Sequence, residues 1–222
     1  MFKGQQRFLR KIFNAVSSPP FDPATLGDPV AMTTEWTPIQ RGGANFKTHA
    51  LLIVSPDRLE FKATGKAKIF HLFLVLIGAI VAILHASKLP QHPGELPLLP
   101  LLLPFLIAAI LIVIGLSKFW SGLAPVVFDR SKGYFWRGRQ APHETFNKDE
   151  IKHHAALEDI YALQLLRERI QSNKTSYYSF ELNLVLKDGR RVHVVDHGNI
   201  ETLRENAAAI GTFLGRPVWD AT

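Results

Sequence analysis

Histidine has the widest chemical range of the side chains in this 222-residue sequence, which contains nine of them. Neutral imidazole binds transition metals and titrates near neutral pH, so clustered histidines would indicate a metal or acid–base site. His153 and His154 are adjacent and diverge on a strand or a helix, whereas His193 and His197 can share a strand face or straddle its end. Neither pair has a metal-binding spacing such as H-E-x-x-H. We therefore predict scattered surface histidines and no metal site.

The other groups capable of catalysis are equally dispersed. Asp129, Asp159, Asp188 and Asp196 stand at expected turns or strand ends, and their spacing pairs none of them. The sequence has no G-x-S-x-G serine motif and no glycine cluster of the phosphate-loop type. It also has no cysteine, which excludes disulfides, thiolate metal sites and cysteine nucleophiles. We expect no catalytic residue, no cofactor and no enzymatic activity.

Two long apolar runs dominate the middle of the chain. Ile69–Ala86 has eighteen residues with no full charge, and its only polar groups are His71 and His85. Leu98–Leu116 has nineteen residues and no polar side chain. About twenty apolar residues cross a bilayer as a helix, and neither run has the polar stripe of a soluble helix. We predict a transmembrane hairpin over 69–117; the alternative is a buried hairpin in a soluble protein. The two histidines are expected near the membrane interfaces.

Basic residues set the expected orientation, because lysine and arginine near span ends stay in the cytoplasm. The spacer between the runs has only one basic residue, Lys88. The first run is preceded by Lys62, Lys66 and Lys68, and the second run is followed by Lys118, Arg130 and Lys132. Both termini are therefore expected in the cytoplasm. Lys118, Phe119 and Trp120 together are typical of an interfacial anchor.

The first eighteen residues form the most basic segment of a chain whose net charge is +7. On a helix, one face would be apolar and the other cationic, which predicts a helix lying on an anionic membrane surface. The alternatives are packing on the protein's own domain or a frayed tail. The expected surface contacts are Phe2, Lys3, Arg7, Phe8, Arg10, Lys11 and Phe13. The Pro-rich stretch 19–45 is predicted to be a linker.

The remaining segments, 46–68 and 118–222, are typical of a β domain that the hairpin interrupts. Turns are expected at Ser55–Arg58 and Asp129–Gly133. The segment 157–170 fits both helix and strand periods, and we favour a strand. Tyr178–Leu186 alternates clearly, and a three-residue loop ending at Gly189 would place Val192 and Val194 on the leucine face.

A C-terminal helix completes the expected elements. Asn199 can cap its start, and Gly215 with Pro217 should end it. About seven strands followed by one amphipathic helix resemble the pleckstrin-homology (PH)-like barrel. The stretches "LEDIYALQLL" and "ELNLVLKDGRRVHVV", with a hairpin after the second strand, are similar to the bacterial YcxB-like membrane proteins. The resemblance implies an α+β membrane protein with a two-helix transmembrane hairpin inserted in a PH-like β-barrel with a C-terminal helix.

The resemblance implies a location in the bacterial inner membrane and a function in binding. We expect a non-catalytic protein whose cytoplasmic PH-like domain binds a protein partner or a lipid headgroup. Membrane lipids are expected partners, and nucleic acid is not. One alternative is an immunity or regulatory protein acting against a membrane-active toxin. A further alternative is an accessory subunit of a membrane enzyme or transporter. The oligomeric state does not follow from the sequence.

Overall fold

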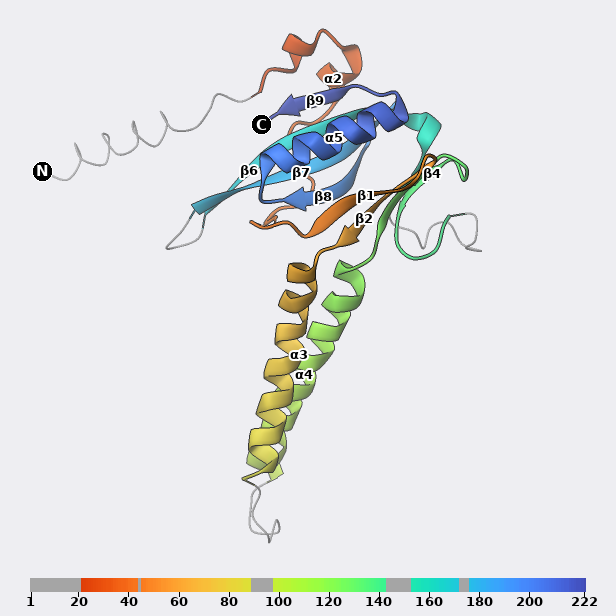
Figure 1. The fold of residues 1–222 in the computed structure, drawn as a ribbon. Helices are drawn as coiled ribbons and strands as arrows, with labels where there is room; N and C mark the ends of the chain where they lie inside the picture. Colours follow the sequence, from red (N-terminus) through yellow and green to blue (C-terminus); the bar gives the residue numbers. More distant parts are fainter. Residues whose placement is uncertain (1–20, 44, 89–97, 143–152, 172–175) are drawn as a thin grey trace, which may run out of the picture.

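The computed structural model describes residues 21–43, 45–88, 98–142, 153–171 and 176–222. A pair of long helices projects from one side of a domain built from two β-sheets (Figure 1). The first sheet is an antiparallel meander in the order β1-β2-β3-β4-β5. Its strands are β1 (His49–Ser55), β2 (Arg58–Ala63), β3 (Val126–Asp129), β4 (Tyr134–Arg137) and β5 (His154–Ala156).

The second sheet has the order β8-β7-β6-β9. Its three long strands are antiparallel, whereas β9 pairs with β6 in parallel. The short helix η4 (Leu157–Asp159) joins the two sheets, and α5 (Ile200–Leu214) links β8 to β9. The strands are β6 (Ile160–Gln171), β7 (Ser176–Leu186), β8 (Arg191–His197) and β9 (Val218–Ala221). The segment 157–170, predicted as a strand, is therefore η4 followed by most of β6.

The expected barrel is not present as a closed structure. Among the described residues, the strands form two separate hydrogen-bonded sheets, and the mixed α+β class is what the structure shows. Two strands also exceed the predicted seven. β5 is only three residues long, and β9 follows the helix that was expected to be the last element of the chain.

The core lies between the inner faces of the two sheets and is covered by α5. It contains the fully buried side chains of Phe61, Phe128, Phe135, Leu163, Leu182, Leu184, Leu203 and Ile210. Asn199 caps α5 by accepting a hydrogen bond from the Thr202 N–H at 2.8 Å, and Gly215 ends it in the left-handed conformation with φ of 66°. Both predictions about this helix are confirmed.

The loop between β7 and β8 also follows the prediction. Gly189 has a φ of 80°, a region that glycine occupies without strain. Val192 lies opposite Leu184 as predicted, and Val194 is buried in the core, although a register shift beyond it places Val195 and not Val194 opposite Leu182. The burial of valine thus selects the three-residue loop over a two-residue one.

Residues 21–43 correct the prediction of a linker over 19–45. They form η1 (Pro23–Leu26), α2 (Pro29–Thr33) and an irregular segment over 34–43, which we call the strap, packed on the outer face of the second sheet. Trp36 contacts the ring of Trp219 at a centroid distance of 5.8 Å, and the Tyr161 hydroxyl donates to Asp28 at 2.8 Å. The prolines that favoured a linker instead begin two short capped helices.

The helices α3 (Gly65–Ala86) and α4 (Leu98–Gly122) leave and rejoin the domain between β2 and β3, as predicted. Both are long and apolar enough to cross a membrane, and only 6% of one candidate span and 12% of the other is buried. Most of the exposed large hydrophobic side chains of the described chain lie on these two helices. At the domain side, α3 begins at Gly65 and α4 ends at Gly122, so both helices extend several residues beyond the expected limits of 69 and 117.

Two glycines set the close approach of α3 and α4. A Cβ at Gly78 would lie 2.8 Å from the Ala108 carbonyl oxygen, and one at Gly115 would lie 2.9 Å from the Val75 nitrogen. At the far end, the His85 ring lies 3.0 Å from the Leu101 carbonyl oxygen through its Nε2. The helices therefore contact one another through backbone as well as side chains, a packing typical of helices in lipid.

We predict that Gly78→Val separates the helix pair. The added side chain meets backbone, so the unfolding free energy in detergent should fall by about 1–3 kcal/mol, the usual cost of overpacking. Gly65→Ala is the matched control, because nothing lies within 4 Å of its Cβ position. Equal denaturation midpoints for Gly78→Val and the control would contradict this packing.

Candidate functional site

The helix pair joins the domain at a region that we call the root, where hydrogen bonds of Thr64 hold the start of α3. Thr64, between β2 and α3, accepts a hydrogen bond from the Ala67 N–H at 3.3 Å and donates to the Lys47 carbonyl at 2.8 Å. Its own N–H donates to the Thr48 carbonyl at 2.9 Å. These bonds cap the helix and fix its first turn to the chain entering β1.

A cavity of about 180 Å³ lies at this root. Its lining combines Ala67 and Gly122, from the domain ends of α3 and α4, with polar side chains of the domain. The polar side chains are Gln40, Thr48, His49, Arg137, His193 and Asp196. The strap, both sheets and both helices thus contribute to one site.

Arg137 supplies the positive charge of the root cavity. Its Nη2 donates to the Val194 carbonyl at 2.7 Å, while its buried Nε has no hydrogen-bond partner in the described part of the chain. Burial lowers the pKa of Arg137, and the Asp196 carboxylate opposes that shift. An arginine remains protonated in any such setting, so the cavity has a fixed cation with an unused donor.

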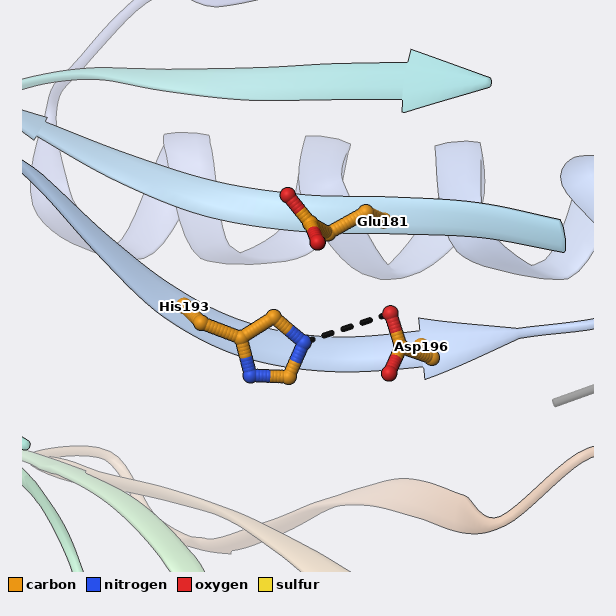
Figure 2. A group of neighbouring side chains, drawn as sticks. All are labelled: Glu181, His193 and Asp196. Atoms are coloured by element: carbon orange, nitrogen blue, oxygen red, sulfur yellow. Dashed lines mark ion pairs between the residues drawn. The ribbon is translucent and has the colours of Figure 1, made fainter. Parts of the chain in front are cut away.

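Three side chains from β7 and β8 form an acidic cluster beside this cation. Glu181, His193 and Asp196 each offer a ligand atom, and the three atoms all lie within 4.8 Å of one another (Figure 2). The His193 Nε2 and an Asp196 carboxylate oxygen are 3.3 Å apart. We refer to these three residues as the triad.

A β-bulge brings the triad together. His193 and Asp196 are three positions apart, so a regular strand would point them to opposite faces. The register of β8 against β7 shifts between Leu182 and Asn183, which leaves Val194 as the extra residue. His193 and Asp196 then share the face of Glu181, a re-aiming of side chains that bulges commonly produce.

The strap holds Glu181 in place. One carboxylate oxygen accepts from the Ile39 N–H at 2.8 Å and from Asn183 Nδ2 at 2.6 Å, and the other accepts from the Gln40 N–H at 2.8 Å. Glu181 is 2% exposed, so these bonds replace water around a buried anion. The strap is therefore part of the site and not a connection to it.

The structure corrects the prediction of scattered surface histidines. His49, His193 and His197 are all buried, and two of them line the root cavity. His197 lies at the end of β8, where its Nδ1 accepts from the Asn199 N–H at 2.9 Å. Burial is the main cause that lowers the pKa of His197.

Exposed cations surround the root. Lys62, Lys66, Lys68 and Arg139 are exposed. A second cavity of about 240 Å³ is lined by Lys68, by the ion pair of Lys62 with Glu60, and by the chain entering β3. The Arg139 guanidinium lies 3.9 Å from the centre of the Trp120 ring, which is 66% exposed. In the predicted interfacial anchor, Phe119 is half-buried. Lys118 belongs to α4, but its side chain is not among those that the structure describes. The predicted surface-contact residues Phe2 to Phe13 also lie outside them.

None of the predicted site residues belongs to the triad. Of the aspartates noted in the sequence, only Asp196 reaches the cavity. Asp129 instead bonds Arg58, Ser131 and the Lys132 N–H at a turn. Comparison with protein-family models, with curated proteins and with solved structures gives no match. The resemblance to PH-like and YcxB-like proteins therefore stays a prediction from the order of elements.

We predict that His197 makes the fold sensitive to acid. Its folded pKa lies below the ordinary value of about 6.5, so unfolding takes up a proton once the pH falls through that value. Stability is then full above about pH 6.5 and declines below it. Urea unfolding of the full chain in detergent at pH 7.5 and 5.5 should show a smaller loss for His197→Gln than for the wild type. Equal losses would contradict this role.

Proposed function

We propose that the protein is anchored in a membrane by α3 and α4 and binds phospholipid headgroups at the root of the helix pair. The observation that carries the proposal is the position of the root cavity, which is bordered by Ala67 and Gly122. A 22-residue helix is about 33 Å long, close to the 30 Å hydrocarbon thickness of a bilayer. With α3 spanning the bilayer, its first turn lies at the level of the headgroups.

The side chains at the root suit this level. Lysines and arginines beside a span favour anionic lipid, each contributing about 1 kcal/mol near the surface. Trp120 and Arg139 place an aromatic ring and a cation side by side, as interfacial anchors do. The same basic residues support a cytoplasmic position for the domain and for both termini. The resemblance to bacterial proteins supports the inner membrane.

Arg137 is the residue we propose to contact the headgroup phosphate. Its Nε lacks a partner in the described chain, and a phosphate oxygen would accept from it. Asp196 offsets the charge of Arg137, so recognition depends on this directed hydrogen bond more than on net attraction. The binding is non-catalytic, and nucleic acid is not a proposed partner.

The edge strand β1 favours a second candidate function, the binding of a protein partner. β1 ends the order of the first sheet, and it exposes three consecutive apolar residues, Leu52, Ile53 and Val54. Ile53 is 76% exposed. An exposed apolar edge is a template on which an extended segment of another protein can add a strand.

The lipid proposal is tested by the phospholipid that the full chain retains in mild detergent, measured by native mass spectrometry. The wild type should carry about one phospholipid, and Arg137→Gln should lose most of it. Arg190→Gln is the matched control, because Arg190 is an exposed loop arginine paired with Asp188. Equal retention by all three proteins would contradict headgroup binding at the root. If Arg137→Gln does not fold, a photoactivatable phospholipid should still crosslink the wild type beside Arg137, and crosslinks elsewhere would contradict the proposal.

The edge-strand proposal is tested with a photo-crosslinking amino acid at Ile53 in cells. A discrete adduct that is lost on Val54→Pro supports strand addition, because proline removes a backbone donor from the edge. An adduct that persists with this substitution, or no adduct, contradicts it.

A further inference from the structure

The triad has the composition of a metal site and not of a simple ion pair. A simple ion pair needs only one carboxylate opposite one histidine. Here two carboxylates face a single imidazole, all three within 4.8 Å. Glu181 and His193 are buried and Asp196 is half-buried, and the group meets solvent through the root cavity that His193 and Asp196 line.

His193 is the observation that points to a ligand. Its side chain is 2% exposed, and neither ring nitrogen has a hydrogen bond within the described part of the chain. The nearest group to Nε2 is the Asp196 carboxylate at 3.3 Å, which approaches without hydrogen-bond geometry. Two ligands at the usual zinc bond lengths in a tetrahedral site are about 3.3 Å apart. The pair therefore has the separation of neighbouring zinc ligands.

Glu181 has the support that metal-binding carboxylates receive from their surroundings. The N–H groups of Ile39 and Gln40 and the amide of Asn183 fix both of its oxygens. A carboxylate has about four lone-pair sites, so three such bonds leave room for a metal. Outer hydrogen bonds of this kind orient ligands and raise metal affinity.

The local charge favours a divalent cation. Glu181 and Asp196 contribute two formal negative charges and Arg137 one positive charge, so these three side chains together are net negative. A divalent ion would reverse that sign. One imidazole nitrogen with two carboxylate oxygens suits Zn²⁺ and similar transition metals better than Mg²⁺ or Ca²⁺, which prefer oxygen ligands alone. The cavity that His193 and Asp196 line provides the entry path.

We infer that Glu181, His193 and Asp196 bind a divalent transition-metal ion of the Zn²⁺ class, with solvent from the cavity as a further ligand. The inference depends on β7, β8 and the strap, and it does not depend on lipid binding. It departs from the expectation of no metal site, which rested on sequence spacing alone.

The test uses the full chain in detergent, stripped with a chelator and titrated with Zn²⁺ against a fluorescent zinc indicator. The wild type should bind one equivalent, and Asp196→Asn and His193→Gln should each weaken binding at least tenfold. Glu168→Gln is the matched control, because Glu168 accepts from the strap N–H of Gly42 at 3.1 Å but lies outside the triad. This control should bind as the wild type does, which separates loss of a ligand from loosening of the strap.

X-ray absorption at the zinc edge gives a readout that does not rely on variants. The expected spectrum has one imidazole and otherwise oxygen ligands. Failure of the wild type to bind a stoichiometric ion, a spectrum with several imidazoles, or unchanged affinity in folded Asp196→Asn and His193→Gln would overturn the inference. Retained phospholipid is measured separately, so either proposal can fail while the other stands.

Discussion

Two long, apolar and largely exposed helices begin and end at one place on a β domain, and the rest of the structure depends on this constraint. A helix satisfies its own backbone groups, so it can leave the sheet without exposing unpaired donors. The chain leaves at the end of β2 and returns at the start of β3, which pair with one another. Because these two strands are neighbours, the helices emerge side by side, and Gly78 and Gly115 allow their backbones to approach closely.

The same constraint accounts for the polar site. Where the helices meet the sheets, the chain cannot continue a regular β core, and a cavity remains between the helix ends, both sheets and the strap. Polar groups concentrate there: backbone groups hold Arg137 and Glu181, whereas the nearest group to the His193 ring is the Asp196 carboxylate. A buried polar group without a partner costs free energy. The unused Arg137 Nε and the His193 ring are therefore the groups that a ligand would satisfy.

Local signals in the sequence predicted the elements of the fold well. The two apolar runs, the turn at Ser55–Arg58, the three-residue loop at Gly189 and the Asn199 cap each depend on a few neighbouring residues, and all are present. Features that depend on distant pairing were missed. The strap binds through backbone N–H groups that carry no sequence signal, and β9 pairs in parallel across α5. The triad requires the bulge at Val194, whereas strict alternation would separate His193 from Asp196. In the sequence, the one hint of the triad was Glu181 close to Asn183 within a strongly alternating strand. The burial of its carboxylate is seen only in the structure.

The central claim is that α3 and α4 cross a membrane, and the side on which the segment between them lies tests it most directly. Cysteine labelling can locate that segment, because the chain has no cysteine of its own. Single cysteines are introduced at Gln91, between the helices, and at Lys132, in the turn after β3, and cells are treated with a membrane-impermeant maleimide. The account predicts labelling at Gln91 in intact cells and at Lys132 only after the membrane is opened. Labelling of both positions, or of neither, in intact cells would contradict a hairpin that crosses the bilayer with the domain on its cytoplasmic side.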